Sequence, residues 1–314
     1  MLPILESGEE TLVGGQAVME GVMMRAPHSY CVAVRKPDGR MVTEQMPLAR
    51  MSELYKIFRL PVFRGIGTLY QALKLGGKAM RFSATASLDD PAATGGQAAP
   101  KELPGWAFTA PIVFSLAFFV FMYKFVPLFL VTRLQHWYPA LEGRVLFNLA
   151  DGTIRLAILL VFLFALSLLK DIRRVFEYHG AEHKVVFNFE SGQPLTVENA
   201  QRFTTFHPRC GTSFLFVVFF LAIPVYTAIP FGGFAAKLAS RVVLLPLLAG
   251  VSYELIRFAA RRRGSFLALL TAPGLWMQRI TTKPPADDQA EVAIHALEGA
   301  MELEKSQGGE LVIA

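Results

Sequence analysis

Residues 150–169 read ADGTIRLAILLVFLFALSLL, and no charged side chain follows Arg155 within this stretch. A helix that crosses a bilayer needs about 17–25 consecutive, predominantly apolar residues. The stretch therefore predicts a membrane-spanning helix. Asp151 and Arg155 stand four residues apart near its start, a spacing that brings two side chains together on a helix. We expect them to form a structural ion pair near the outer membrane interface.

Three more stretches are long and apolar enough to span a bilayer, at about 107–131, 213–230 and 238–259. A shorter apolar run at 265–277 is interrupted by Pro273 and Gly274, and it is expected to lie at the interface or to re-enter the membrane. The sequence thus predicts a mainly α fold: a polytopic membrane bundle of about four spans with a small cytoplasmic N-terminal α+β region.

The composition agrees with a membrane protein. Hydrophobic residues make up 53% of the 314 residues, and the mean hydropathy of +0.40 is high for a soluble chain. The formal net charge is +6, but no basic run carries the interleaved aromatic residues of a nucleic-acid platform. We therefore expect the lipid bilayer, and not nucleic acid, as the partner. With only two cysteines, Cys31 and Cys210, no disulfide framework is expected.

Lysine and arginine are unevenly distributed among the connections between these spans. The connections at 132–149 and 231–237 hold few of them, whereas 170–212 and the RRR at 261–263 are rich in them. Basic connections stay in the cytoplasm. The first residues, MLPILESGEETLVGG, lack the basic and continuous apolar parts of a secretory signal. We therefore expect a multi-pass protein of the inner (plasma) membrane with both termini and the 170–212 loop in the cytoplasm.

The chain is expected to comprise four parts: a cytoplasmic N-terminal region at 1–83, a linker at 84–105, a membrane domain at 106–277 and a cytoplasmic tail at 278–314. The linker is rich in Ala, Gly and Pro and poor in large apolar residues. The membrane domain includes the 170–212 loop, which carries the polar motifs described below.

Local patterns predict three elements outside the spans. Residues 31–48 alternate around a Pro-Asp-Gly turn and predict a β-hairpin. Residues 52–82 combine a helical apolar period with basic residues, which is typical of a helix lying on a membrane surface. The acidic start at Asp287 and Asp288 predicts a helix at about 287–304. Its packed stripe is expected to comprise Val292, Leu297 and Met301.

The motif YHGAEHK at 178–184 carries the most specific chemistry. His179 and His183 are spaced i and i+4, so on a helix both imidazoles face the same side and can share one Zn²⁺. Glu182 lies close enough to act as a general base toward water at the metal. The order H-x-x-E-H matches the inverzincin pattern. Gly180 weakens the expectation of a helix, and the alternative is a polar helix end without catalytic function.

Two further segments could complete a metal site. HPRCG at 207–211 adds His207 and Cys210 on the same predicted loop. Glu254 lies in the fourth predicted span, where a carboxylate is costly unless it is paired, buried or functional. It is a candidate third ligand, or alternatively it pairs with Arg257. HPRCG also has a plainer interpretation, as a turn into the third span, and a nucleophilic role for Cys210 at a helix start is the weaker alternative.

Near the N-terminus, residues 14–27 read GGQAVMEGVMMRAP. The glycine spacing matches neither a dinucleotide fingerprint nor a P-loop. We interpret the segment as turn-rich, with Gln16, Glu20 and Arg25 as polar groups that could close over a cytoplasmic site.

Several of these segments together resemble the YqhQ-like family of bacterial membrane proteins: GGQAVMEGVMMRAP, FRGIGTLYQALKLGGK, YHGAEHK, LTVENAQ with HPRCGTSF, GVSYE and PGLWMQRITT. The resemblance covers nearly the whole chain and implies a metal-dependent enzyme without a particular substrate. The family's TTREPDD-like stretch appears here as TTKPPADD, which argues against an essential Arg-Glu pair. The polar positions that the resemblance marks are Gln16, Glu20, Arg25, His179, Glu182, His183, His207, Arg209, Cys210 and Glu254.

Two functional hypotheses follow from these observations. The first is metal-assisted hydrolysis of a peptide, lipid or small substrate at the cytoplasmic membrane face, with zinc or another divalent metal as cofactor. The second is a non-enzymatic membrane scaffold, or a small transport or lipid-handling protein, whose histidines and glutamates are structural. Geometry distinguishes them, because His179, His183 and a third ligand must converge within about 4–5 Å to meet zinc bond lengths.

Overall fold

The computed structural model describes residues 13–88, 105–208, 210–229, 232–261 and 272–306. The chain divides into two compact units, which are described in turn. The first unit combines three stretches that are far apart in the sequence, and the second combines two. The first comprises Met1–Ala99, Leu166–Cys210 and Leu275–Ala314, and the second comprises Pro100–Ala165 and Gly211–Gly274.

The first unit contains a four-stranded antiparallel sheet in which each strand pairs with the next along the chain. The predicted hairpin at 31–48 is confirmed as the third and fourth strands. The interpretation of 14–27 as turn-rich is wrong, because this segment forms a second hairpin. The strands are β1 (Gly14–Val18), β2 (Gly21–Arg25), β3 (Ser29–Arg35) and β4 (Met41–Pro47).

The turn between β1 and β2 explains why this hairpin was not recognised from the sequence. Val18 pairs with Gly21, so only Met19 and Glu20 form the turn. Glu20 adopts a φ of 52°, in the left-handed region that is uncommon for residues other than glycine. A Cβ at Gly21 would lie 2.2 Å from the carbonyl oxygen of Ala33. The glycine therefore serves the close approach of β2 to β3, and it does not mark a loop.

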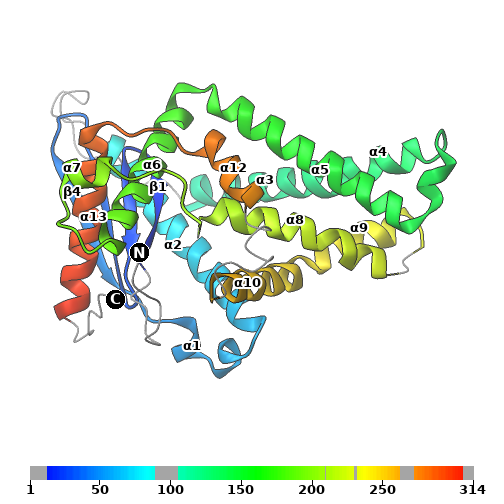
Figure 1. Ribbon diagram of the computed structural model, residues 1–314, viewed down its shortest axis with the longest axis horizontal. Coiled ribbons are helices and arrows are strands. Elements are labelled where there is room, and N and C mark those ends of the chain that lie inside the picture. Colours follow the sequence, from blue (N-terminus) through cyan, green and yellow to red (C-terminus); the bar gives the residue numbers. More distant parts are fainter. Residues whose placement is uncertain (1–12, 89–104, 209, 230–231, 262–271, 307–314) are drawn as a thin grey trace. The chain divides into compact units, whose positions relative to one another are not determined.

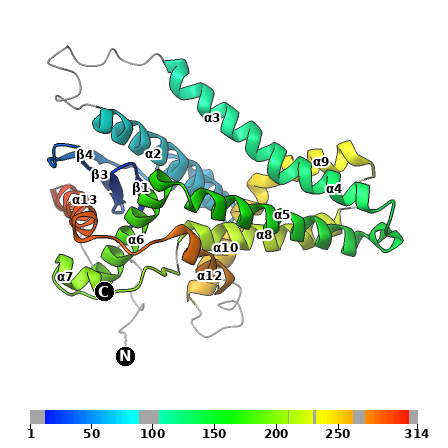
Figure 2. The same cartoon turned by 90° about the horizontal axis from the view of Figure 1, so that it is seen from above.

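Strands β2 and β3 are buried on both faces of the sheet, so β3 does not alternate between apolar and polar residues. Tyr30, Val32 and Val34 pack against Leu75 and its neighbours on α2 (Phe63–Leu88). The alternate residues of the sheet, such as Ala33, pack against α6 (Lys170–Glu190) and α13 (Asp287–Ser306). Figure 2 shows α2 and α13 on opposite sides of the strands.

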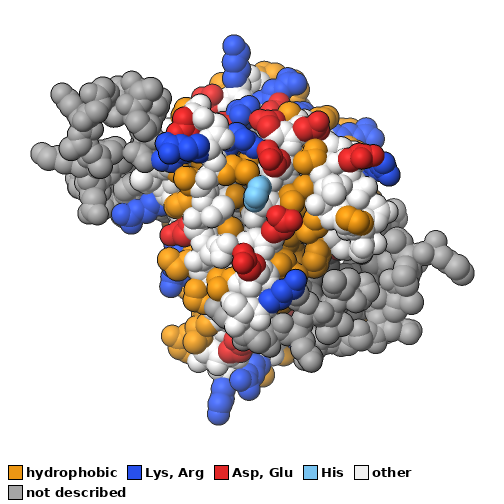
Figure 3. Space-filling view, turned by 90° about the vertical axis from the view of Figure 1, so that its left-hand side faces the viewer, with side chains coloured by type: hydrophobic (Ala, Val, Ile, Leu, Met, Phe, Trp, Pro, Cys, Tyr) orange, Lys and Arg blue, Asp and Glu red, His pale blue; other side chains and the backbone are white. Residues whose placement is uncertain are grey.

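The C-terminal helix α13 confirms the helix predicted at about 287–304. Its expected stripe of Val292, Leu297 and Met301 is buried against the sheet. The opposite side of α13 is exposed. The face of the molecule shown in Figure 3 carries acidic side chains among hydrophobic and basic ones.

The segment 170–212, expected to be a loop, contains the 21-residue helix α6 and the short α7 (Val197–Gln201). Helix α6 runs through Gly180 without a break. A Cβ at Gly180 would lie 2.0 Å from the carbonyl oxygen of Lys283. The amide of Lys283 also donates to the carbonyl of Phe176 at 2.9 Å. Gly180 therefore lets a distant backbone segment pack directly on the helix.

The helix expected at 52–82 is divided into three pieces: α1 (Met51–Leu54), the 3₁₀-helix η1 (Lys56–Arg59) and α2. The break before α2 follows Pro61, and Val62 there has a φ of 70°. Helix α2 continues to Leu88, so the first residues of the expected linker at 84–105 are helical. Most of that linker lies outside the described residues.

The second unit consists of apolar helices (Figure 1). Helix α3 (Gly105–Val120) continues through the π-helical η2 (Phe121–Phe125) into α4 (Val126–Leu134). The 3₁₀-helix η3 (Pro139–Glu142) then leads to α5 (Arg144–Ser167). The remaining elements are α8 (Gly211–Ala228), α9 (Phe234–Val243) and α10 (Leu245–Arg261).

Three helical stretches are long and apolar enough to cross a membrane: Val113–Leu134, Arg144–Ser167 and Gly211–Ala228. The fourth predicted span, 238–259, falls on a helix pair bent by 48° between α9 and α10. Pro246 lies in the first turn of α10, where its missing N–H and its ring prevent continuation of the preceding helix. Large apolar side chains such as Phe114 and Val161 are 71% and 68% exposed, as expected for surfaces that face lipid.

The last apolar run, at 265–277, is described only from residue 272. From there the chain forms α12 (Ala272–Thr281). This helix carries the PGLWMQRIT part of the family-like motif, and its final residues contribute to the polar site of the first unit.

Candidate metal centre

Helix α6 places His179 and His183 side by side, with ring centroids 4.5 Å apart. The Nδ1 of His179 lies 2.9 Å from the carbonyl oxygen of Thr281. The Nδ1 of His183 lies 2.5 Å from the carbonyl oxygen of Thr205. Because a carbonyl only accepts hydrogen bonds, each Nδ1 is the donor. Nε2 is then the ring nitrogen left for a ligand, the arrangement that metal-ligating histidines usually show.

Cys210 supplies a third donor to the same point. Its Sγ lies 3.3 Å from Nε2 of His179. Ligand atoms of His179, His183 and Cys210 all lie within 4.8 Å of one another, so this group could hold a metal ion. Two imidazoles and a thiolate suit zinc, whose bonds to nitrogen and sulfur are about 2.0–2.1 Å and 2.3 Å. We refer to these three residues as the His-His-Cys cluster.

Glu182 lies beside the cluster and is buried. One of its carboxylate oxygens is 3.5 Å from Nε2 of His183. Strand β1 covers this side chain, and a Cβ at Gly15 would lie 2.7 Å from Cγ of Glu182. The absence of a side chain at Gly15 therefore makes room for the glutamate.

His207 lies next to the cluster, with its ring centroid 5.5 Å from that of His183. Its Nε2 is 3.7 Å from a carboxylate oxygen of Glu190. Burial lowers the pKa of His207, and the nearby Glu182 carboxylate partly opposes this shift. His207 was a candidate ligand, but the group of converging donor atoms contains Cys210 in its place.

Two side chains hold the segment that leads from α7 to Cys210. Lys184, the last residue of YHGAEHK, donates from Nζ to the carbonyls of Gln201 and Phe203, each at 2.7 Å. Gln278 of α12 accepts from the backbone amide of His207 and donates to its carbonyl, both at 2.8 Å. The amide of Cys210 in turn donates to the same carbonyl at 3.3 Å. These contacts fix the backbone that presents the thiol.

Glu20 forms a separate polar contact on the same helix. Arg174 of α6 donates to Glu20 at 2.5 Å, and the hydroxyl of Tyr178 lies 3.4 Å from its other oxygen. Burial raises the pKa of Tyr178, and the Glu20 carboxylate adds to the increase. The turn residue thus ties β1 and β2 to the first half of α6, up to the residue that precedes His179.

Of the other polar candidates, Gln16 is the one whose side chain the structure places on another helix. Gln16 lies against α2, since a Cβ at Gly76 would be 2.6 Å from its side-chain oxygen. Gly15 and Gln16 thus face opposite sides of the sheet, as neighbouring strand residues do. Arg25 ends β2. Glu254 belongs to α10 of the second unit, and Arg209 lies outside the described residues.

Some residues of the centre carry no recognisable ligand pattern in the sequence. Thr205 and Thr281 contribute backbone carbonyls, which any residue could supply, so composition cannot reveal them. Gln278 and Thr281 do fall within PGLWMQRITT, one of the segments that carry the family resemblance. Gly15 likewise belongs to GGQAVMEGVMMRAP, and that segment covers Glu182 in place of closing as a loop.

Comparison with known proteins agrees with this resemblance. The chain is 33% identical over 297 residues to "Uncharacterized protein YqhQ" of Bacillus subtilis (strain 168), covering 93% of this chain and 92% of that protein. No solved structure matches it. Residues 60–303 match the family described as "Protein of unknown function (DUF1385)". The chain therefore belongs to the DUF1385 family, which includes YqhQ-like proteins.

Proposed function

We propose that the His-His-Cys cluster binds one divalent metal ion, with zinc as the best match, and that the protein is a metal-dependent hydrolase. The observation that carries this proposal is the orientation of the two histidine rings. Each has its Nδ1 directed at a backbone carbonyl. One ring nitrogen of each lies within 4.8 Å of the other donor atoms of the cluster, and Nε2 of His179 is 3.3 Å from Sγ of Cys210. A merely structural pair of histidines has no need for a thiol at the same point.

The three protein ligands are the number found in catalytic zinc sites, which keep their fourth position open. A zinc ion held in this way is a Lewis acid that lowers the pKa of water in the open position. His179, His183 and Cys210 would hold the ion, and the carbonyls of Thr281 and Thr205 would keep the two rings in their ligating orientation.

Glu182 would act as the general base. Its carboxylate lies beside Nε2 of His183 at 3.5 Å, and it is covered by β1 next to Gly15. A buried carboxylate at this distance can take a proton from water at the cluster and return it to a leaving group. Glu182 would thereby contribute to turnover without serving as a metal ligand.

We further propose that the protein resides in the inner (plasma) membrane with the first unit in the cytoplasm. Three to four apolar helices support membrane insertion. The basic residues of 170–212 support the orientation, because such segments remain on the cytoplasmic side. Neither Cys31 nor Cys210 forms a disulfide bond, which suits a reducing compartment. The substrate would be an ester or amide that reaches the cytoplasmic membrane face.

Metal analysis of the full-length protein purified in detergent tests the metal site. We expect close to one equivalent of zinc per chain, and His183→Ala should remove it. His295→Ala is the matched control, because His295 is an exposed histidine of α13 in the same unit. Full occupancy of the His183→Ala protein would rule out the site.

A second measurement separates catalysis from metal binding. Zinc-loaded protein should hydrolyse an activated ester such as p-nitrophenyl acetate, and Glu182→Gln should lose at least about a hundredfold of this rate while it keeps its zinc. Equal rates for the parent and Glu182→Gln proteins would leave a metal site without hydrolase function.

A further inference from the structure

The described part of the second unit buries more basic than acidic side chains. Asp151, Arg155, Arg241 and Lys124 are 1%, 1%, 2% and 4% exposed. Asp151 pairs with Arg155, which confirms that expected ion pair, and it also lies 3.4 Å from Nε of Arg241. Lys124 is within electrostatic range of all three. One carboxylate thus faces two guanidinium groups and one amine inside apolar helices, where uncompensated charge is costly.

The buried network also contains unsatisfied polar atoms. Oδ1 of Asp151 and Nε of Arg155 are buried without a hydrogen-bond partner among the residues that the structure describes. The guanidinium groups of Arg155 and Arg241 both lie over the aromatic ring of Tyr226, at 5.6 and 4.9 Å from its centroid. Such a network is electrostatically incomplete without a further polar or anionic partner.

A small polar cavity lies beside these charges. It has a volume of about 40 Å³. Three basic side chains and one carboxylate line it together with neutral polar groups: Arg144, Lys237, Arg241, Glu142, Gln135, Asn148 and Ser240. A cavity needs about 10–15 Å³ to hold one water molecule, so there is room for about three waters or the oxygens of one small anion. Arg241 donates to Oδ1 of Asn148 at 3.0 Å, and Lys237 lies 4.0 Å from the centroid of the Phe147 ring.

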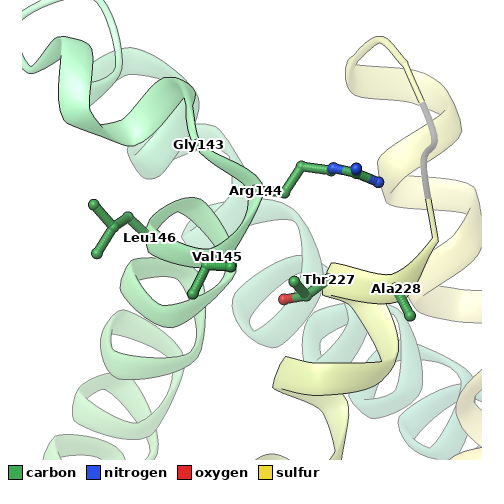
Figure 4. Close-up of a pocket in the computed structure, with 6 residues that line it drawn as sticks. All are labelled: Gly143, Arg144, Val145, Leu146, Thr227 and Ala228. Atoms are coloured by element: carbon green, nitrogen blue, oxygen red, sulfur yellow. The ribbon is translucent and has the colours of Figure 1, made fainter.

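A larger pocket adjoins this cavity at Arg144, which lines both. It has a volume of about 600 Å³, and apolar side chains of Val145 and Leu146 line it. Figure 4 shows Arg144 extending from the start of α5, with Thr227 and Ala228 at the end of α8 lining the same pocket. Val145 is 64% exposed. A cationic cavity thus opens onto an apolar surface.

Helix irregularities occur on two of the elements that carry these residues. Lys124 belongs to the π-helical η2, and such segments are frequent at functional sites. Lys237, Ser240 and Arg241 belong to α9, which ends at the 48° bend before α10. Broken helices in membrane bundles commonly border binding sites, because the freed backbone groups need partners.

We propose that the second unit binds a phosphate-bearing anion through Lys237 and Arg241, and that the pocket beside Arg144 accepts the acyl chains when this anion is a phospholipid head group. Arginine and lysine are the usual partners of phosphate, and Asn148 and Ser240 add neutral polar groups at the same cavity. The anion would balance the excess positive charge around Asp151. This site is independent of the metal centre, since all its residues belong to the second unit.

Native mass spectrometry of the full-length protein in detergent tests the proposal with three probes: phosphatidylglycerol, phosphatidylcholine and inorganic phosphate. We expect saturable binding of phosphatidylglycerol in preference to phosphatidylcholine. Lys237→Gln should weaken it by roughly tenfold or more, the usual loss for a hydrogen bond to a charged group. Arg144→Gln provides a second variant at the boundary of the two pockets, should Lys237→Gln fail to fold.

Arg133→Gln is the matched control. Like Arg144, Arg133 is an exposed arginine near a helix end of this unit. It lies over the Phe129 ring and is not among the residues that line the cavity. Binding of inorganic phosphate that depends on Lys237, without lipid binding, would support the phosphate site and assign it to a free anion. Three results would each overturn the proposal. They are equal affinity for the two lipids without phosphate binding, an equal loss of binding in Arg133→Gln and Lys237→Gln, and no binding of any probe.

Discussion

Gln278 and His207 exchange two hydrogen bonds: the side-chain oxygen of Gln278 accepts from the His207 amide, and its side-chain nitrogen donates to the His207 carbonyl, both at 2.8 Å. The two residues are 71 positions apart in the chain, and both are buried. The side chain of Gln278 therefore pairs with the backbone of the segment that ends at Cys210, as a neighbouring strand would. It connects α12 to the thiol of the proposed metal site.

Replacing Gln278 by Ala should weaken zinc binding without removing any ligand. Loss of a residue that supports metal ligands typically costs about 10–100-fold in metal affinity, because the thiol is then no longer held near His179. Competition with a chromophoric chelator measures this affinity in the full-length protein. Gln71→Ala is the control, since Gln71 is remote from the cluster in sequence and donates an exposed hydrogen bond to the backbone of Ala49. Equal zinc affinities of the two variants would show that the hydrogen bonds of Gln278 do not position Cys210.

Gly180→Ala should destabilise the first unit. The new Cβ would meet the carbonyl oxygen of Lys283 at 2.0 Å, so the backbone must move, and overpacking of this kind costs about 1–3 kcal/mol. Gly77→Ala on α2 has no heavy atom within 4 Å of the added Cβ. It should be neutral or stabilising by up to about 1 kcal/mol, because alanine favours the helix. Thermal unfolding followed by circular dichroism distinguishes the two, and similar midpoints would contradict the packing argument.

The two thiols should react differently with iodoacetamide. Burial, with a contribution from Glu44, raises the pKa of Cys31 to about 12, so at pH 8 it remains a protonated, inaccessible thiol. Cys210 should be protected while zinc is bound and should become alkylated after chelation. Peptide mass spectrometry reads both positions, with denatured protein as the reference for full labelling. Alkylation of Cys210 that is indifferent to zinc would argue against its role as a ligand.

The stability of the first unit should fall with decreasing pH through Glu304, whose carboxylate is 3% exposed. Burial alone would raise the pKa of Glu304, but hydrogen bonds from the amide and ring of His28 and from Ser29 outweigh it and lower the pKa. A carboxyl group with a lowered folded-state pKa stabilises the fold above its unfolded pKa of about 4.3. This contribution is lost as the pH falls through the folded-state value.

Glu304→Gln should therefore be less stable than the parent at pH 7, with a difference that narrows as the pH drops below about 4. Thermal midpoints between pH 7 and pH 3 measure this directly. Glu302→Gln, an exposed neighbour on α13, is the control and should run parallel to the parent. A constant gap between the Glu304→Gln and parent curves would mean that the carboxylate charge is not responsible.

In the second unit, Asp151→Asn should be strongly destabilising. It removes the carboxylate that faces Arg155 and Arg241, and breaking a buried ion pair from one side costs about 3–5 kcal/mol. Glu142→Gln, at an exposed carboxylate of the same unit, should change stability little. Unfolding of the detergent-solubilised protein monitored by tryptophan fluorescence provides the comparison. Equal midpoints would indicate that the network tolerates its excess positive charge.

Much of the second unit could be predicted from sequence because lipid imposes a simple rule. A spanning segment must satisfy its own backbone and must be apolar over its length, so stretches such as 150–169 identify themselves. The bend between α9 and α10 was not anticipated, although Pro246 provides its cause. The i, i+4 spacing of His179 and His183 likewise marked one side of a helix before any coordinates.

The sequence by itself determined the apolar helices, the hairpin of β3 and β4, helix α13 and the histidine pair, because each depends on neighbours within a few residues. Only the tertiary structure decided that α6 continues through Gly180, that β1 and β2 form strands, and that Cys210 joins the histidines. These features depend on groups distant in the chain, the carbonyl of Lys283, the backbone of β3 and the side chain of Gln278. Local propensity contains no information about such partners, so the His-His-Cys cluster becomes visible only once the chain is folded.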